Sequence, residues 1–338
     1  MKRPALPKQA VTSVDVARHL GISQSTVSRS LANHPLVAEA TRQRVVEAAN
    51  ALGYRPNALA RSLITGRSGL IALVSTSMAN PFYAEAIREF SERLQANGLQ
   101  LLLFSVPTHH AFDDVIRKVL EYDVDGLIIV SSSLSSKAVL QCKEAGLPVL
   151  LFNRRIDDER IDMVCCDNLE GGRTIASFLA QTGHRTFGFI AGLEDTSTNR
   201  DRLRGFSEQL REFDAGELRV ERGDYTYAGG REAAIRMALR KDRPDAIFCA
   251  NDIMAIGALD GLRGDLGLRV PEDISIVGFD DIPMASWSGI DLTTVRQPRS
   301  RMIGISLDIL LANQSSPGRD PVCHIEPGQL IVRKTVRV

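Results

Sequence analysis

The sequence predicts a small α-helical domain followed by a larger α/β core built from two doubly wound parallel sheets. Two observations lead to this prediction. Short amphipathic helix patterns joined by a glycine turn occupy the first fifty residues. From Gly69 onward, continuous apolar strand segments alternate with amphipathic helices, and the rhythm then repeats. A chain of 338 residues is long enough for two or three folding units.

The first predicted helix covers residues 13–20. Its apolar residues recur at the spacing of one helical face and are Val14, Val16, Ala17 and Leu20. Thr12 stands where it can cap this helix, and Asp15 follows three residues later, as in a capping box. Gly21 then ends the helix, because glycine accepts the left-handed conformation that a sharp exit needs.

Two further helices complete the small domain. Ser23 can cap a helix over 24–31, whose inward face is Val27 and Leu31. A third helix over 39–51 is followed by a closing Gly53-Tyr54 pair. Its expected packing residues are Val45, Val46, Ala49 and Leu52. The first two helices therefore predict a helix-turn-helix, which can lay its second helix in the DNA major groove.

The exposed face of the second helix is short and polar. Its side chains are Gln24, Ser25, Thr26, Ser28 and Arg29. Arg29 suits a guanine base, because two of its donors match the O6 and N7 acceptors. The plainer alternative is a small helical hairpin whose polar face is simply exposed to solvent.

Charge is distributed unevenly along the chain, although the net charge is zero. Residues 1–67 contain ten Lys and Arg but three Asp and Glu, a net charge of +7. The remaining residues must therefore carry −7. A basic head on an acidic body is what DNA binding through one end requires.

A linker follows the helical domain. Pro56 forces Arg55 away from helical geometry and so places a boundary there. Asn57 can cap a short helix over 58–63, which is too short to be stable in water by itself.

The α/β core is predicted as two tandem subdomains. The first half has strands over 70–75, 99–104, 126–130 and 149–152, with helices over 82–97, 111–122 and 136–145. The alternation then continues with strands over 163–166, 186–190, 246–250 and 275–279 and one near Arg219, and with helices over 169–182, 199–213, 228–240 and 252–264. Strands that are apolar throughout indicate parallel sheets covered on both faces. In such folds ligands bind at the carboxyl ends of the strands.

Two motifs give the sequence a specific resemblance. D-V-A-x-x-x-G-I-S-x-x-T-V-S-R, followed by T-R-x-R-V-x-x-A-x-x-x-L-G-Y-x-P-N-x-x-A-R-S-L, resembles the amino-terminal domain and hinge of the LacI/GalR family of bacterial repressors. The resemblance continues over nearly the whole chain. It implies a homodimeric, ligand-responsive transcriptional regulator that binds a near-palindromic operator. It also implies a core similar to periplasmic sugar-binding proteins, with a small polyhydroxylated effector between two lobes that rotate about a hinge.

The resemblance also implies domain boundaries and DNA contacts. We expect a helix-turn-helix domain over 1–56, a hinge helix and linker over 57–67, and an effector-binding and dimerisation core over 68–338. The core divides into an N-subdomain over about 68–166 and 298–325 and a C-subdomain over about 167–297 and 326–338. The expected DNA-binding residues are Thr12, Ser23, Gln24, Ser25, Thr26, Ser28, Arg29, Asn33, Tyr54, Asn57, Ala60, Arg61 and Leu63. Leu63 matches a leucine that wedges into the minor groove when the hinge folds on the operator; its alternative role is linker packing.

The expected effector-binding residues follow strands of the core. They are Asn80, Phe82, Asn153, Arg202, Tyr225, Asn251 and Asp280. Arg202 begins an R-x-x-G-F motif that, in the family, contacts the effector. Side chains of Arg, Asn and Asp suit vicinal hydroxyls, and aromatic rings can cover the apolar face of a sugar.

Several neighbours of these residues have competing roles. One residue of the Phe82-Tyr83 pair must face inward, and we assign Phe82 to the cleft. Asp252 is expected to cap the following helix rather than to contact a ligand. Asp281 is expected to have a structural or dimer-face role, and Trp287 is a candidate for the cleft mouth.

Other classes of protein are less well supported. The five cysteines are scattered without C-x-x-C, as in a reduced cytoplasmic protein, and no metal-ligand spacing occurs. We found neither a secretory apolar segment in residues 1–11 nor an apolar run long enough to span a membrane. G-x-S-x-G, P-loop, G-x-G-x-x-G and H-E-x-x-H motifs are absent, so we expect no cofactor and no enzyme. The alternatives are a sugar-binding receptor and a sugar-metabolising enzyme with an appended DNA-binding head.

Overall fold

The protein forms two compact units, Met1–Gly69 and Leu70–Val338, which we call the head and the core. The computed structural model describes residues 11–31, 34–54, 67–76, 78–106, 112–130, 136–156, 158, 160–315 and 318–338. Each unit has hydrophobic clusters of its own.

The head contains three helices, α1 (Ser13–Leu20), α2 (Gln24–Leu31) and α3 (Glu39–Leu52). The Asp15 carboxylate accepts hydrogen bonds from the Thr12 backbone N–H at 3.0 Å and hydroxyl at 2.7 Å, so the expected capping interaction forms. Gly21 has φ 65° and ends α1 in the left-handed conformation. The Ser23 hydroxyl accepts the Thr26 N–H at 3.1 Å and begins α2.

Two residues that we expected in the core of the head are instead exposed. Val14 is 44% exposed and Val46 is 42% exposed. Successive helical residues are rotated by about 100°, so each of these side chains lies beside the buried stripe of its helix. The buried hydrophobic residues in the described part of the head are Val16, Ala17, Val27, Val45, Ala48 and Ala49.

The core contains two six-stranded sheets, which define an N-lobe and a C-lobe. The N-lobe sheet has the order β11-β5-β4-β3-β1-β2. Its strands are β1 (Leu70–Ser75), β2 (Gln100–Ser105), β3 (Gly126–Val130), β4 (Val149–Phe152), β5 (Asp162–Cys166) and β11 (Cys323–Glu326). The C-lobe sheet has the order β12-β10-β9-β8-β6-β7. Its strands are β6 (Phe187–Ala191), β7 (Leu218–Arg222), β8 (Ala246–Cys249), β9 (Ser275–Asp280), β10 (Thr293–Arg296) and β12 (Gln329–Ile331).

The paired strands are parallel except for β12, which pairs antiparallel with β10. Central strands such as β3, β6 and β9 are buried along their whole length, as expected for sheets covered on both faces. The edge strands β2 and β7 are partly exposed. The predicted pair of doubly wound parallel sheets is therefore confirmed.

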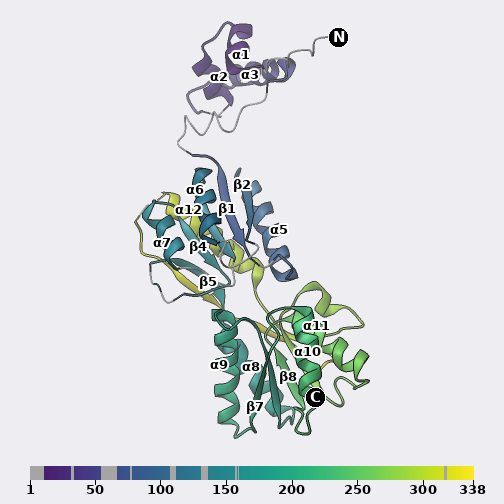
Figure 1. The fold of residues 1–338 in the computed structure, drawn as a ribbon. Coiled ribbons are helices and arrows are strands. Elements are labelled where there is room, and N and C mark those ends of the chain that lie inside the picture. Colours follow the sequence, from purple (N-terminus) through teal and green to yellow (C-terminus); the bar gives the residue numbers. More distant parts are fainter. Residues whose placement is uncertain are drawn as a thin grey trace, which may run out of the picture. The chain divides into compact units, whose positions relative to one another are not determined.

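Helices cover both faces of each sheet (Figure 1). The N-lobe helices are α5 (Pro81–Ala96), α6 (Phe112–Glu121), α7 (Ser136–Glu144) and α12 (Arg299–Ser315). The C-lobe helices are α8 (Asn168–Gln181), α9 (Ser197–Glu212), α10 (Tyr227–Ala238) and α11 (Asp252–Asp260). In the C-lobe, α8 packs with α9 and α10 packs with α11. The helix expected over 252–264 changes at its end, because α11 continues into a short π-helix over Gly261–Asp265.

The chain passes between the lobes at three crossovers. It leaves the N-lobe after β5, returns to it after β10 to form α12, and leaves again after β11. The residues joining these elements are 166–168, 296–299 and 326–329. The crossovers bring residues that are distant in sequence to the boundary between the lobes.

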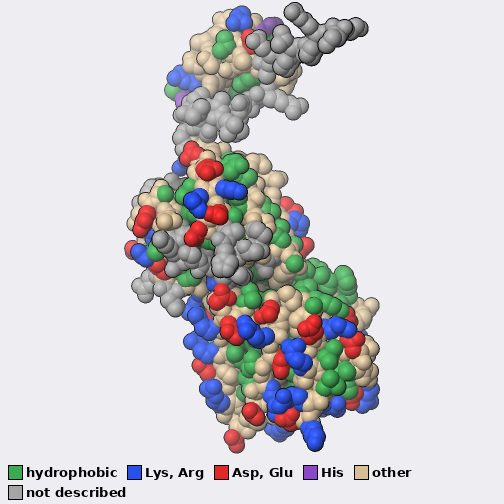
Figure 2. Space-filling model, in the orientation of Figure 1, with side chains coloured by type: hydrophobic (Ala, Val, Ile, Leu, Met, Phe, Trp, Pro, Cys, Tyr) green, Lys and Arg blue, Asp and Glu red, His purple; other side chains and the backbone are tan. Residues whose placement is uncertain are grey.

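The surface of the core carries interspersed charges on the face shown in Figure 2. Charged side chains of the core form ion pairs, including Arg236–Glu221 at 2.9 Å and Arg269–Asp273 at 2.9 Å. Among the described residues, no helix is long and apolar enough to cross a membrane.

Candidate functional site

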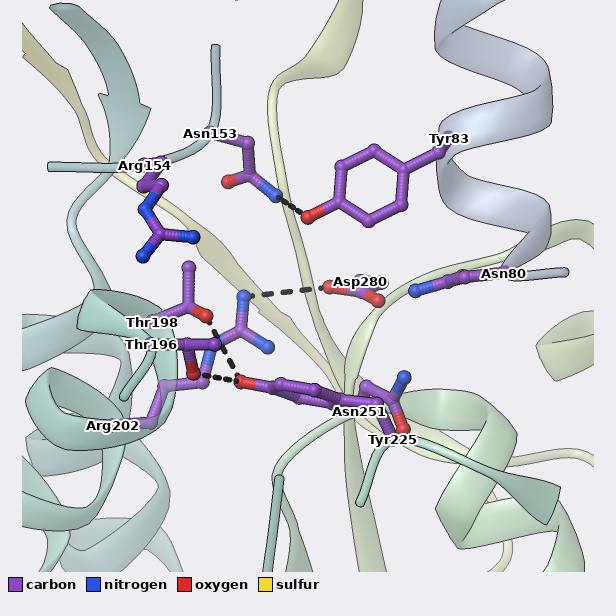
Figure 3. Close-up of a pocket in the computed structure, with 10 residues that line it drawn as sticks. All are labelled: Asn80, Tyr83, Asn153, Arg154, Thr196, Thr198, Arg202, Tyr225, Asn251 and Asp280. Carbon is purple, nitrogen blue, oxygen red and sulfur yellow. Dashed lines mark hydrogen bonds and ion pairs between the residues drawn. The ribbon is translucent and has the colours of Figure 1, made fainter. Parts of the chain in front are cut away.

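A pocket lies between the two lobes of the core, with about 430 Å³ of empty space that includes its opening to solvent (Figure 3). The lining residues are Asn80, Tyr83, Asn153, Arg154, Thr196, Thr198, Arg202, Tyr225, Asn251 and Asp280. Six of the seven residues that we expected to bind an effector therefore line one pocket; Phe82 does not.

Parallel strands explain why these side chains meet. Asn153 directly follows β4, Asn251 follows β8, and Asp280 ends β9. The carboxyl ends of parallel strands lie at one edge of a sheet, and here the edges of two sheets face one another. Polar residues from both lobes thereby converge on the pocket.

Helix caps fix the orientation of two pocket amides. The Asn80 Oδ1 accepts the Phe82 N–H at 3.0 Å and caps α5. The Asn251 Oδ1 accepts the Met254 N–H at 3.0 Å and caps α11. Asn251 Nδ2 is buried and has no hydrogen-bond partner among the described residues, so it remains a donor for a bound molecule.

The expectation that Asp252 caps α11 was wrong, because Asn251 occupies the cap and Asp252 is the first helical residue. Asp252 is fully buried and accepts the Ile282 N–H at 2.9 Å and the Thr294 hydroxyl at 2.6 Å. Burial, together with the nearby Asp280 carboxylate, raises the pKa of Asp252 well above its usual value. Asp252 thus joins β10 and the loop after β9 to the start of α11.

Arg202 is held from four sides. Its Nε donates to Asn168 Oδ1 at 2.8 Å, and its Nη1 donates to the Ala250 carbonyl. Its Nη2 lies 3.5 Å from Asp280 Oδ1, and its Cζ lies 3.7 Å from the centroid of the Phe279 ring. These contacts hold the buried guanidinium in one orientation beside the pocket.

Asp280 is the acceptor of the pair. Its Oδ1 also accepts the Gln297 Nε2 at 2.7 Å. Burial raises the pKa of Asp280, while the Arg202 charge and the hydrogen bonds from Gln297 and Asn80 oppose that rise. Asp280 therefore contacts donors from the C-lobe, from a crossover and from the N-lobe.

Two tyrosines extend from opposite lobes, as Figure 3 shows. The Tyr225 hydroxyl lies 2.9 Å from the Thr198 hydroxyl and 3.3 Å from the Thr196 hydroxyl. Gly192 makes room for the Tyr225 ring, since a Cβ there would lie 2.2 Å from a ring atom. The Tyr83 hydroxyl accepts the Asn153 Nδ2 at 3.4 Å, and burial raises the pKa of Tyr83 to about 12.

Tyr83, not Phe82, faces the pocket, so our assignment of that pair was wrong. Phe82 is 1% exposed and belongs to the buried stripe of α5, which continues through Ala86, Phe90 and Leu94. Its ring stacks with Phe152 at 6.5 Å. Tyr83 lies about 100° around the helix from that stripe.

Other residues around the pocket have structural roles or lie outside it. Trp287 is 59% exposed and is not among the lining residues, contrary to its candidacy for the cleft mouth. The Asp281 carboxylate pairs with Arg296 and Arg333, each at 2.7 Å, and thereby ties β9 to β10 and to the segment after β12.

Tyr83, Arg154, Thr196 and Thr198 also line the pocket but were not among the seven residues that we expected to bind the effector. Arg154 directly follows Asn153, so its place after β4 was a usable signal. Thr196 caps α9 by accepting the Asn199 N–H at 3.3 Å. A threonine at the cap position shortly before the R-x-x-G-F motif was therefore the sequence signal for Thr196 and Thr198.

In the head, the predicted DNA-reading face is accessible. Thr12, Ser23, Gln24, Ser25 and Arg29 are exposed, while Thr26 and Ser28 are half-buried. Tyr54 packs against the core of the head. The remaining predicted DNA contacts lie outside the described residues and are Asn33, Asn57, Ala60, Arg61 and Leu63.

The described part of the chain contains no cluster of side chains that could hold a metal ion. The five cysteines are free, and four of them are buried.

Comparisons with known proteins find matches for both the head and the core. Residues 13–57 match the model of bacterial regulatory proteins of the lacI family, and residues 176–336 match a periplasmic binding protein-like domain. The chain is 32% identical over 331 residues to the HTH-type transcriptional repressor PurR of Photobacterium profundum, covering 96% of this chain and 98% of PurR. It is 33% identical over 309 residues to the repressor CytR of Escherichia coli, covering 90% of each chain.

A solved structure agrees with these relatives. The lac repressor dimer bound to operator and the anti-inducer ONPF superposes with a TM-score of 0.87 at 28% identity, covering 98% of this chain and 100% of that chain. The agreement spans both the helical head and the two-lobed core. The chain therefore belongs to the LacI family of bacterial regulatory proteins and is a transcriptional repressor of that family.

Proposed function

We propose that a small polyhydroxylated effector, a sugar or sugar derivative, binds in the pocket between the lobes and controls the affinity of this repressor for its operator. The observation that carries the proposal is the buried Arg202–Asp280 pair, 3.5 Å apart, beside pocket amides with unused hydrogen-bonding capacity. Guanidinium and amide N–H groups donate, and carboxylate and amide oxygens accept. A hydroxyl group does both, so a polyol matches this set of side chains. The two tyrosine rings add surface for the apolar face of a sugar ring.

The proposed mechanism is a two-state equilibrium of a homodimer in the cytoplasm. In one arrangement of the lobes, the two heads fit the half-sites of a near-palindromic operator. An effector that prefers one arrangement shifts this equilibrium by its difference in affinity for the two states. The proposed division of labour is DNA reading by residues 1–56, operator-dependent folding of the hinge at 57–67, and effector binding with dimerisation by residues 68–338.

Binding measurements on Arg202→Ala and Asp280→Ala test the site. Isothermal titration of the full chain would use D-ribose, D-glucose, D-galactose, D-gluconate, D-galacturonate and glucose 6-phosphate. Each substitution removes a partner of the effector and leaves a polar group of the bound effector unpaired, at a cost of about 1–3 kcal/mol, or roughly 5- to 150-fold in Kd. Arg200→Ala is the matched control, because Arg200 lies two residues earlier on α9 and is half exposed.

Gel shifts with an operator selected from random duplexes then give the sign of the response. For an inducer, both substitutions should keep the repressor on DNA when the effector is present. For a co-repressor, both should fail to bind operator. Folded variants that bind the effector like the wild type would show that the pocket had been assigned to the wrong residues.

A further inference from the structure

We propose that Asn168 and Gln297, two amides on the crossovers between the lobes, position the Arg202–Asp280 pair and couple it to lobe rotation. This inference rests on the proposed function of the pocket. Neither amide is among the residues that line the pocket. Both are nearly fully buried, with 6% and 4% exposure. They are therefore positioning residues that act through Arg202 and Asp280.

The two amides occupy two different crossovers. Asn168 lies two residues after the end of β5, where the chain first enters the C-lobe. Gln297 directly follows β10, where the chain returns to the N-lobe. A rotation of one lobe against the other changes backbone torsion angles at such connecting residues. Side chains attached there move with the change.

Asn168 bonds in two directions. Its Oδ1 accepts the Arg202 Nε at 2.8 Å, and its Nδ2 donates to the Cys166 carbonyl at 2.9 Å. These two bonds fix which end of the amide faces Arg202, since Nε can only donate and the carbonyl can only accept. Asn168 thus connects a pocket guanidinium directly to the last residue of an N-lobe strand.

Gln297 holds the Asp280 carboxylate, as Asn168 holds the Arg202 guanidinium. Its Nε2 donates to Asp280 Oδ1 at 2.7 Å. Its Oε1 is buried and has no hydrogen-bond partner among the described residues. A buried acceptor without a donor is unfavourable. This arrangement of the second crossover is therefore incompletely satisfied, and a different lobe arrangement that supplies a donor would be favoured.

Asn168 and Gln297 together connect the Arg202–Asp280 pair to both crossovers. Arg202 and Asp280 lie 3.5 Å apart, and each is bonded to an amide on a different crossover. The Asn80 side chain of the N-lobe points toward Asp280 across the pocket (Figure 3). A molecule that rearranges the pair must therefore displace groups attached to both crossovers. The converse also holds, because lobe rotation alters the geometry of the pair.

Distance measurements between the lobes test this proposal without any effector. Nitroxide labels would be placed on the full chain at two exposed positions, Gln95 in α5 and Arg211 in α9, with Cys323→Ser to remove the exposed thiol. Pulsed electron resonance then gives the distribution of inter-lobe distances. Asn168→Ala and Gln297→Ala should each add a new distance population that the wild type lacks.

A control and a second Asn168 variant separate coupling from general disruption. Asn313→Ala removes an amide that bonds Asp162 at 2.6 Å within the N-lobe, and it should leave the distribution unchanged. Asn168→Asp keeps an oxygen acceptor for the Arg202 Nε but loses the donor to the Cys166 carbonyl, so it should still add the new population because the connection to the N-lobe is broken. If Asn168→Ala does not fold, Gln297→Ala tests the same claim from the other crossover.

A double substitution tests the route through the arginine. In an Arg202→Ala background, Asn168→Ala should add no further change, because the amide acts through Arg202. An undiminished extra change would reduce Asn168 to a structural crossover residue. Wild-type distributions in both alanine variants would overturn the proposal. Neither result depends on effector binding, so the proposed function stands or falls separately.

Discussion

Three residues of the pocket adopt left-handed or otherwise positive φ angles without being glycine. The angles are 57° at Asn153, 59° at Tyr225 and 120° at Asp280. Such conformations cost free energy and persist where the surroundings hold them. Here the hydrogen bonds of the side chains and the close packing of Tyr225 on Gly192 hold them. The pocket therefore contains stored backbone strain on both sides.

Buried His184 predicts a pH dependence of stability. Its Nδ1 lies 3.0 Å from the Leu179 carbonyl and its Nε2 lies 2.8 Å from the Ser275 hydroxyl, which suits the neutral ring protonated on Nδ1. Burial lowers the pKa of His184 below 6.5. Between that lowered value and 6.5 the unfolded chain binds more protons, so the free energy of unfolding falls as pH falls. One proton limits this slope to about 1.4 kcal/mol per pH unit.

Urea unfolding between pH 7.5 and 5 would measure the effect. His184→Gln should flatten the decline, whereas His19→Gln, at an exposed position on α1, should leave it unchanged. A profile of His184→Gln parallel to that of the wild type would assign the pH dependence to other groups.

The position of Arg29 on α2 predicts that its side chain reads a base of the operator. It is exposed in the last turn of α2, and its forked donors match guanine. Arg29→Ala should cost about 1–3 kcal/mol on the preferred operator and relax base preference at one position per half-site. Arg44→Ala removes the same charge from an exposed position on α3 and is the matched control. Equal losses of Arg29→Ala on the operator and on scrambled DNA would show a phosphate contact only.

For single residues, the sequence predicted which residue types form the pocket better than it predicted which way each side chain points. Asn153, Asn251 and Asp280 were found because strand ends are visible in an apolar pattern. Phe82 and Tyr83 were exchanged, because a sequence does not show the rotation of a helix about its axis to within 100°. Asn168 and Gln297 were missed, because their partners lie 34 and 17 residues away and become neighbours only through the crossovers.

Among the helices, α8 and α9 make the closest backbone approach that bears on the site. A Cβ on Gly205 would lie 1.9 Å from the Leu169 carbonyl oxygen, and one on Gly172 would lie 2.3 Å from the Arg202 carbonyl oxygen. Only glycine fits at such distances, since backbone atoms cannot move aside individually. This close packing sets the position of the helix that carries Arg202.

Gly205→Ala should therefore separate the two helices. We expect a loss of about 1–3 kcal/mol in the free energy of unfolding, as for overpacking, and a weaker effector affinity because Arg202 is displaced. Gly264→Ala is the matched control, because nothing lies within 4 Å of the added Cβ. Thermal and urea unfolding of both variants would measure the difference. Equal stability of the two variants would contradict the close-packing argument.

The order and type of the elements were largely predictable, because continuous apolar strands and amphipathic helices alternate clearly. The antiparallel pairing of β12 with β10 was not predicted, since its three residues are only partly buried and lack a strong strand pattern. The π-helix after α11 was also missed, because one extra residue within a helical turn leaves no signature in the hydrophobic pattern.

The two lobes of the core have the same strand order, and the carboxyl ends of their strands face each other across the pocket. Five strands of each sheet follow the doubly wound order 2-1-3-4-5, as β2-β1-β3-β4-β5 in the N-lobe and β7-β6-β8-β9-β10 in the C-lobe, and the chain crosses between the sheets three times. Multiple crossovers restrict the relative motion of the lobes to a rotation about the connecting segments. A small molecule held by both lobes can therefore select one arrangement.

Because a linker joins the head to the core, we expect operator binding and effector binding to be separable. The head has a hydrophobic cluster of its own, and the core has two others. Leu63 lies in the linker, outside the described residues, and we expect it to wedge into the minor groove when the hinge folds on the operator. Leu63→Ala removes the apolar contact that offsets base unstacking. It should weaken operator binding and reduce DNA bending, while the affinity for the effector stays that of the wild type.

A fragment spanning residues 67–338 provides the matching control. It lacks the head and the linker but retains both sheets, so it should bind the effector like the full chain and bind no operator. Gel shifts on circularly permuted operator fragments would measure bending, and isothermal titration would measure effector affinity. Unchanged bending and operator affinity in Leu63→Ala would leave Leu63 as linker packing. A loss of effector affinity in the variant but not in the fragment would mean that the linker acts on the core, which contradicts independent units.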